Sequence, residues 1–265
     1  MQDIPQGFFL ALTVFLGLVF GSFATAVAYR VPRGISLVKK QRSACPSCNR
    51  SLTAVELVPV FSWLFLRGRC RSCKAAIGAR YPFIELATLC LCLAFYARFG
   101  FTPQSLCLFA LAPVITAIVA IDLEFKIIPD GLNLAILGLG ALSLAAGAVG
   151  APEAFAFVVE KGGAALAGAA VYLSASLLLR YGVMAALKKD PLGWGDIKFF
   201  GAAGFWLGIN PDSGAYLMLL SGIFGIVLAL LWKKLRKGPE FPFGPALLAA
   251  FTAMLLWQGP GLMSF

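Results

Sequence analysis

The chain of 265 residues is 60% hydrophobic and only 13% charged, with a mean hydropathy of +0.87. A soluble surface needs more charge than this, so the composition excludes a single soluble domain. Apolar runs of roughly 18–22 residues recur along the chain, which indicates an all-α polytopic membrane protein. The alternating short strands that are typical of a membrane β-barrel are absent from the sequence.

The sequence contains no histidine. This excludes Ser-His-Asp and Cys-His catalysis, HExxH zinc peptidases and histidine-ligated metals. Hydrolytic chemistry would have to use carboxylates, lysine or hydroxyls, and zinc would have to be held chiefly by cysteine. The formal net charge is +10. Its position in loops indicates contact with the lipid bilayer and not with nucleic acid.

The first apolar span covers residues 8–29. It lacks a basic n-region and a small-residue cleavage signal, so we interpret it as a retained helix and not as a signal peptide. Residues 30–82 carry eleven lysines and arginines against a single acid, Glu56. By the positive-inside rule this loop is cytoplasmic and the N-terminus lies outside.

Seven further spans follow, which gives about eight transmembrane helices. They are residues 83–99, 104–122, 131–150, 163–184, 198–209, 213–232 and 243–258. Twenty lysines and arginines then fall on the inner side, and only Arg98 and Lys161 fall outside. The predicted division is a first transmembrane helix (1–29), a cytoplasmic zinc-binding segment (30–82) and a seven-helix membrane domain (83–265).

Two CxxC pairs, separated by twenty-one residues, lie in the cytoplasmic segment. Their thiols belong to Cys45, Cys48, Cys70 and Cys73. Two such pairs predict a closed tetrahedral zinc site with a structural role, because four cysteines leave no open catalytic position. A redox CxxC pair or two disulfides is the alternative, which a reducing cytoplasm disfavours. We expect Leu57 to Phe61, between the pairs, to pack as a small core.

Two aspartates lie at the predicted cytoplasmic edge of the membrane. Asp122 ends the third span, and Asp196 precedes the sixth in the stretch Gly193 to Lys198. A carboxylate at that depth is costly unless it is paired or functional. Two carboxylates close together share a proton, so one can act as base toward water while the other donates to a carbonyl oxygen. This is aspartyl-protease chemistry, which requires no histidine, nucleophilic side chain or metal.

Residues near the aspartates have predicted supporting roles. Gly193 and Gly195 would permit a tight turn and close approach of an extended peptide. We expect Asp130 to cap the N-terminus of the fourth span. In the alternative interpretation, the two aspartates cap helices or pair with Lys126 and Lys198 and have no catalytic role.

These motifs together resemble the bacterial type IV prepilin peptidases, membrane aspartyl proteases with the GxGD signature. The similarity extends over nearly the whole chain. It is carried by Gly21-Ser22-Phe23, both CxxC pairs, Arg80-Tyr81-Pro82 with Glu85, Ile121-Asp122 through Pro129-Asp130, Gly193-Trp194-Gly195-Asp196-Ile197-Lys198 and Pro242-Phe243-Gly244-Pro245.

The resemblance implies cleavage of type IV prepilin or type II secretion pseudopilin leaders after a glycine, at the cytoplasmic face of a bacterial inner membrane. It also implies N-methylation of the new N-terminal residue from S-adenosylmethionine. It makes Asp122 and Asp196 the catalytic pair, makes residues 83–265 the peptidase domain, and assigns zinc to the four cysteines. One departure is Glu56-Leu57-Val58-Pro59, where the family commonly has Glu-Asn-Ile-Pro. If that segment positions the methyl donor, this change affects methylation and leaves proteolysis untouched.

The implied substrate has a basic leader, which the basic segment 30–82 should repel. Local acids that could offset this are Glu56, Glu124, Asp130 and Asp190. Two other classes of protein stay open. A proton-coupled transporter would use the paired carboxylates but does not explain the cysteines. A membrane-anchored zinc scaffold without catalysis would need the cysteines and not the aspartates.

Overall fold

The computed structural model describes residues 6–38, 42–188, 192–209, 211–235 and 241–262. Eight helices in this part of the chain correspond one to one with the eight predicted spans. They are α1 (Gln6–Arg30), α3 (Arg80–Phe99), α4 (Pro103–Phe125), α5 (Asp130–Gly150), α6 (Ala154–Leu187), α7 (Trp194–Leu207), α8 (Pro211–Lys234) and α9 (Gly244–Gln258). The short helix α2 (Phe61–Phe65) and the 3-10 helix η2 (Ala54–Leu57) lie between α1 and α3.

Six of the eight helices are long and apolar enough to cross a membrane, and α7 and α9 are not among these six. These two helices have only 14 and 15 residues, whereas about 20 are needed to span a bilayer. Each is followed directly by a glycine, Gly208 or Gly259, whose φ of 73° or 77° is one that other residues rarely adopt. The prediction of a polytopic all-α membrane protein is confirmed.

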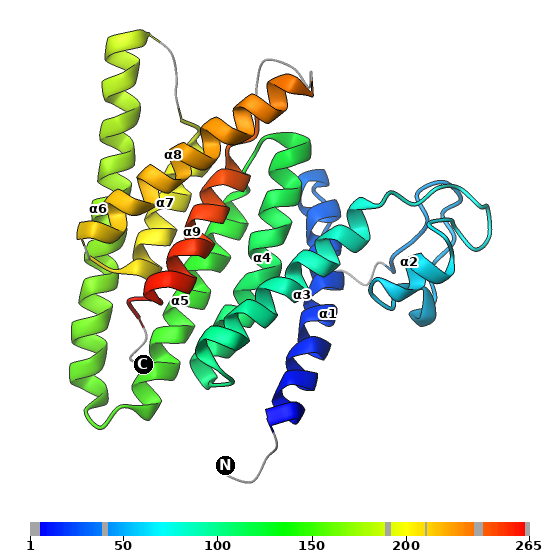
Figure 1. Ribbon diagram of the computed structural model, residues 1–265, viewed down its shortest axis with the longest axis horizontal. Helices are drawn as coiled ribbons and strands as arrows, with labels where there is room; N and C mark the ends of the chain where they lie inside the picture. The colour runs from blue at the N-terminus through cyan, green and yellow to red at the C-terminus, as the bar shows by residue number, and fades with distance from the viewer. Residues whose placement is uncertain (1–5, 39–41, 189–191, 210, 236–240, 263–265) are drawn as a thin grey trace.

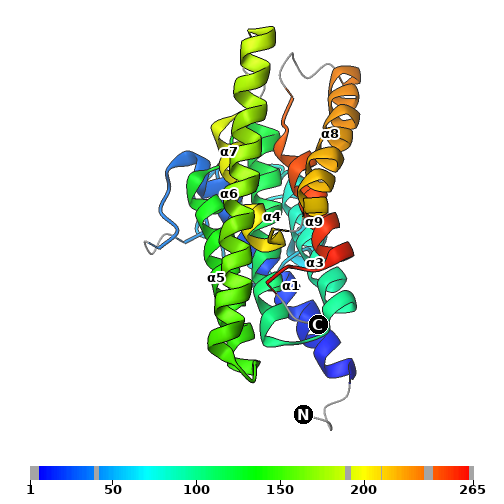
Figure 2. The ribbon, with the colours of Figure 1, turned by 90° about the vertical axis from the view of Figure 1, so that its left-hand side faces the viewer.

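Helix α4 is the centre of the bundle. It packs against α1, α3, α5 and α9, and 72% of its apolar stretch is buried, compared with 17% for α8. Figures 1 and 2 show α5 and α6 on one side of α4, and α1 and α3 on the other. Helices α4, α6 and α8 end toward the upper side of Figure 1, where α5, α7 and α9 begin. Residues at these helix ends therefore meet on one face.

Small residues let neighbouring helices approach closely. A Cβ on Gly21 of α1 would lie 2.8 Å from the Cα of Glu85 in α3. A Cβ on Gly168 of α6 would lie 2.5 Å from the carbonyl oxygen of Gly204 in α7. Contacts of this kind stabilise helix pairs in lipid by van der Waals packing. The pair Gly168–Gly204 holds the short helix α7 against the long helix α6.

Helices α6 and α7 begin earlier than the sequence predicts. Helix α6 has 34 residues and starts at Ala154, not at residue 163. Helix α7 starts at Trp194, so the charged stretch around Asp196 forms its first turn and is not a loop before it.

The segment between α1 and α3 forms a separate unit, which lies beside α1 and α3 (Figure 1).

Candidate active site and metal centre

Asp122 lies in the last turn of α4 and is buried. Its Oδ2 accepts a hydrogen bond from the backbone N–H of Gly244, at 2.7 Å. Gly244 is the first residue of α9, so this donor belongs to a helix N-terminus, where N–H groups point outward and favour negative charge. A Cβ at position 244 would lie 2.8 Å from the same oxygen. The sequence motif around Gly244 therefore serves as the partner of Asp122.

Asp196 lies in the first turn of α7, which is outside the six membrane-spanning helices. Its Oδ2 accepts a hydrogen bond from the backbone N–H of Gly193, at 3.1 Å. Burial and the neighbouring charge of Asp122 raise the pKa of Asp196 to about 7. The fold thus brings two carboxylates from distant parts of the chain within electrostatic range, as the sequence predicts. Near neutral pH the pair can hold one proton.

The first turn of α7 rests on the loop that joins α4 to α5. A Cβ on Gly195 would lie 2.9 Å from the carbonyl oxygen of Ile128, and Asn133 donates to the carbonyl of Gly195 at 3.1 Å. Gly193 has a φ of −65°, which other residues adopt equally well. Gly195 permits close contact between α7 and this loop, and at Gly193 it is space that favours glycine, because a Cβ there would lie 3.0 Å from Oδ2 of Asp196.

Lys198 and Asp130 connect α7 to the start of α5. The Lys198 Nζ donates to Asp130 Oδ2 at 2.7 Å. The expectation that Asp130 caps α5 is wrong: the N-cap is Pro129, and no side chain there accepts a capping hydrogen bond. Because Lys198 is engaged by Asp130, the ion pair between Lys198 and Asp196 considered above is absent among the described contacts.

Glu124, two residues after Asp122, joins three helix ends. One carboxylate oxygen accepts from Arg33 at 3.0 Å, and the other accepts from Arg80. Arg33 follows α1 and Arg80 begins α3, so Glu124 fixes both ends of the intervening segment to α4. Glu124, Asp130 and Glu56 all have cationic partners, while Asp190 lies outside the described residues.

Arg180 is a supporting residue that the sequence pattern does not single out, because it counts there only as one of the twenty cations on the inner side. It is buried in α6, and it donates to the carbonyl of Leu192 at 2.7 Å. Its guanidinium also lies 4.5 Å from the centre of the Trp194 ring, a cation–π contact. A buried arginine near the end of an apolar span is itself a functional signal. Here it holds the chain that leads into Asp196.

The four predicted metal ligands come together. The sulfur atoms of the cysteines all lie within 4.8 Å of one another, and those of Cys45 and Cys73 are 3.8 Å apart. Four thiolates around zinc at about 2.3 Å would be about 3.8 Å apart. The cluster can therefore bind a metal ion with the dimensions of a tetrahedral site made of four cysteines.

The two CxxC turns have the same backbone geometry. Asn49 N–H donates to Cys45 O at 2.8 Å, and Lys74 N–H donates to Cys70 O at 3.1 Å. Hydrogen bonds from the backbone of Cys73 and Ser72 lower the pKa of the Cys70 thiol to about 6. A lowered pKa favours the thiolate, which is the form that binds metal.

Glu56 forms hydrogen bonds and an ion pair with neighbouring residues of the same segment. It forms a capping box with Thr53 at the start of η2, and it forms an ion pair with Arg50 next to the first CxxC turn. The hydrogen bonds from Thr53 and then Arg50 lower its pKa to about 2. This acid therefore stays ionised and connects η2 to the cysteine cluster.

Together the fold and the site define a multi-pass membrane protein with two carboxylates at one face, the buried Asp122 and the partly buried Asp196, and with a four-cysteine cluster that can bind a metal ion. The chain belongs to the type IV leader peptidase family, whose model matches residues 107–230. A second model, the bacterial peptidase A24 N-terminal domain, matches residues 15–99.

Relatives match over most of their length. A protein of Burkholderia pseudomallei (strain 1026b) is 32% identical over 97% of this chain and 88% of its own. One from Bacillus subtilis (strain 168) is 32% identical over 97% of both chains, and one from Aeromonas hydrophila is 33% identical over 94% and 91%. All three are named prepilin leader peptidase/N-methyltransferase. No solved structure matches the chain.

Proposed function

We propose that this protein is an aspartic endopeptidase of the bacterial inner membrane that removes the leader peptides of type IV prepilins or pseudopilins. The cut follows a glycine at the cytoplasmic face, and the new N-terminal residue is then N-methylated. The observation that carries the proposal is the carboxylate pair Asp122 and Asp196, each held by a backbone N–H, in a chain of the leader peptidase family. The names of the relatives support both activities.

In the proposed reaction the pair shares one proton. Asp122 is the base, because it accepts the shorter of the two backbone hydrogen bonds, 2.7 Å from the first N–H of α9 against 3.1 Å at Asp196, and such a donor stabilises its ionised form. Asp196 carries the proton, in keeping with its raised pKa. Asp122 takes a proton from a water molecule, and the oxygen of that water attacks the carbonyl carbon of the scissile peptide bond. Asp196 donates its proton to the carbonyl oxygen. When this intermediate collapses and the C–N bond breaks, Asp122 gives the departing amine the proton that it took from water, and Asp196 recovers a proton from the hydroxyl whose oxygen becomes the new carbonyl oxygen.

The supporting residues hold this geometry. Gly195 and Asn133 fix the start of α7 on the loop that follows α4, and Lys198 fixes α7 to Asp130. Arg180 orients the chain immediately before α7. These contacts come from three helices, so a small displacement of any one of them would separate the two carboxylates.

The four-cysteine cluster is proposed to hold one structural zinc ion. Its dimensions suit zinc, and four thiolate ligands leave no position for a substrate. The methyl group would come from S-adenosylmethionine, passing from its sulfonium to the free α-amine that cleavage exposes. This second activity rests on the names of the relatives and on the presence of the cysteine segment.

Mass spectrometry of a prepilin incubated with the purified protein and S-adenosylmethionine tests the proposal, because it detects cleavage position and methylation together. Asp122→Ala and Asp196→Ala are expected to abolish cleavage. Glu160→Gln, which changes an exposed carboxylate in α6, is the matched control and should cleave normally. Full cleavage by either aspartate variant would overturn the assignment. Proton uptake in proteoliposomes that is lost in the same variants would favour a transporter instead.

A further inference from the structure

A basic pocket lies at the second CxxC turn. It has a volume of about 360 Å³ and is lined by Leu66, Arg67, Arg69, Cys70, Arg71 and Lys74. Four of the six lining residues are cations, and none is an acid. Among the residues that the structure describes, none of these four cations forms an ion pair. The only acid of the segment, Glu56, is already engaged by Arg50.

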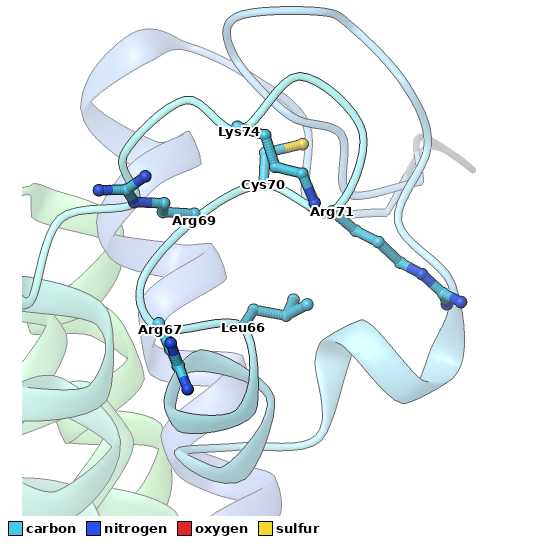
Figure 3. A pocket seen from close by; sticks show the side chains of 6 residues that line it. All are labelled: Leu66, Arg67, Arg69, Cys70, Arg71 and Lys74. Atoms are coloured by element: carbon cyan, nitrogen blue, oxygen red, sulfur yellow. The ribbon is translucent and has the colours of Figure 1, made fainter.

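The backbone holds this pocket in a fixed shape. Arg67 and Gly68 have φ angles of 51° and 64°, and the Gly68 N–H donates to Trp63 O at 2.9 Å. The indole of Trp63 covers Gly68 and donates to Ile77 O at 3.0 Å. Figure 3 shows Arg67 at one end of the pocket and Lys74 at the other, with Arg69 and Arg71 pointing in opposite directions from the turn. The cations therefore present a broad positive surface.

Apolar side chains are exposed next to these cations. On α2, Phe61 is 50% exposed, Leu64 is 56% exposed and Phe65 is 84% exposed. The expectation that Leu57 to Phe61 form a small core is wrong, because Leu57 and Val58 are more than 40% exposed as well. Aromatic and leucine side chains beside lysine and arginine are typical of surfaces that lie in the headgroup region of a bilayer.

The position of the unit in the fold is consistent with such a surface. Figure 1 shows the unit beside α1 and α3, to the side of the helix bundle and not above its end. Both of its ends are tied to membrane helices, because Arg33 and Arg80 pair with Glu124 of α4. A unit at the side of the bundle is therefore placed to reach a bilayer that surrounds the membrane helices.

We propose that this unit docks on the membrane that the chain spans, with anionic phospholipid headgroups as its ligand. Arg67, Arg69, Arg71 and Lys74 bind the phosphate groups, and the exposed side chains of α2 enter the headgroup layer. Charge complementarity favours this occupant, because anionic lipids attract clustered lysine and arginine. The docking does not depend on the proposed peptidase activity. If that activity holds, the bound phosphates also reduce the repulsion between this segment and a basic leader.

Hydrogen–deuterium exchange of the full-length, metal-loaded protein in nanodiscs tests the docking without any substrate. Amides of residues 61–74 are expected to exchange more slowly in phosphatidylglycerol than in phosphatidylcholine. The protection should disappear at high salt, about 0.5 M, where charges are screened within a few ångströms. Arg69→Gln/Arg71→Gln should lower the ratio of docked to free unit on the order of 25-fold, because each cation contributes about fivefold.

Two further variants separate docking of this unit from the effect of a change in the protein's total charge. Phe65→Ser keeps every charge and removes the most exposed anchor, so it should weaken the protection in phosphatidylglycerol. Lys233→Gln/Lys234→Gln removes two exposed cations at the end of α8 and should leave the protection unchanged. Bound metal measured in each variant shows that the cysteine cluster is intact.

Equal exchange rates in the two lipids would overturn the proposal. So would a loss of protection in Lys233→Gln/Lys234→Gln as large as that in Arg69→Gln/Arg71→Gln. Protection by inorganic phosphate in phosphatidylcholine nanodiscs would also overturn it, since the pocket would then be a site for a soluble anion. Cleavage of prepilin is not part of these measurements, so their outcome is distinct from that of the peptidase assay.

Discussion

Replacing Gly244 with alanine should disable the peptidase while leaving the fold intact. The added Cβ would lie 2.8 Å from Oδ2 of Asp122 and 3.0 Å from its Cγ, which is closer than side chains tolerate. The carboxylate must then move away from the 2.7 Å hydrogen bond with the N–H of residue 244. A hydrogen bond to a charged group contributes about 1.5–3 kcal/mol, so its loss corresponds to roughly a 10- to 150-fold lower cleavage rate.

The assay is kcat/KM for a prepilin substrate in detergent or nanodiscs. Alanine has a higher helix propensity than glycine, so the substitution carries no intrinsic penalty for α9. Gly222→Ala in α8 is the matched control, because a Cβ there meets no atom within 4 Å. Metal content and methylation of a pre-cleaved pilin should be normal in both variants. If Gly244→Ala cleaves at more than half of the normal rate, the inferred role of this N–H is wrong.

Three other predictions follow from the site. The pKa of Asp196 is about 7. Above that pH the shared proton is lost, so kcat/KM should fall about tenfold per pH unit. A kcat/KM that stays constant up to about two pH units above the pKa would contradict this prediction. Glu124→Gln should lower the free energy of unfolding by about 1 kcal/mol, since it weakens two partly exposed ion pairs. Thermal unfolding of this variant, compared with that of the control variant Glu160→Gln, measures the difference. Cys70→Ser should remove about one zinc per chain by metal analysis, and retention of the full metal content would exclude Cys70 as a ligand.

The helices could be predicted from the sequence because a bilayer demands long apolar runs, and hydropathy reports those directly. The early start of α6 was missed because Glu160 and Lys161 interrupt the run, although these two side chains form an ion pair at 3.5 Å and remain helical. The early start of α7 was missed because glycine and aspartate have low helix propensity. Packing of Gly195 on Ile128 outweighs that local preference.

The candidate site could be predicted only in part. The two aspartates and the four cysteines are visible as residue types at informative positions. Their partners are not, because Glu124 meets Arg33 across 91 residues and Arg80 across 44. The role of Gly244 was hidden for the same reason: its distance from Asp122 in the chain is 122 residues. Pairings of this kind depend on how helices pack, which no local pattern records.

A double-mutant cycle of prepilin cleavage tests the central claim that Asp122 and Asp196 act as one catalytic pair. Asn is the appropriate replacement, since it keeps the shape and removes the titrating group. The account predicts that Asp122→Asn, Asp196→Asn and the double variant lose cleavage to the same residual level, because residues that act as a unit are not additive. Substantial cleavage by either single variant, or a double variant whose loss is the product of the two single losses, would contradict it.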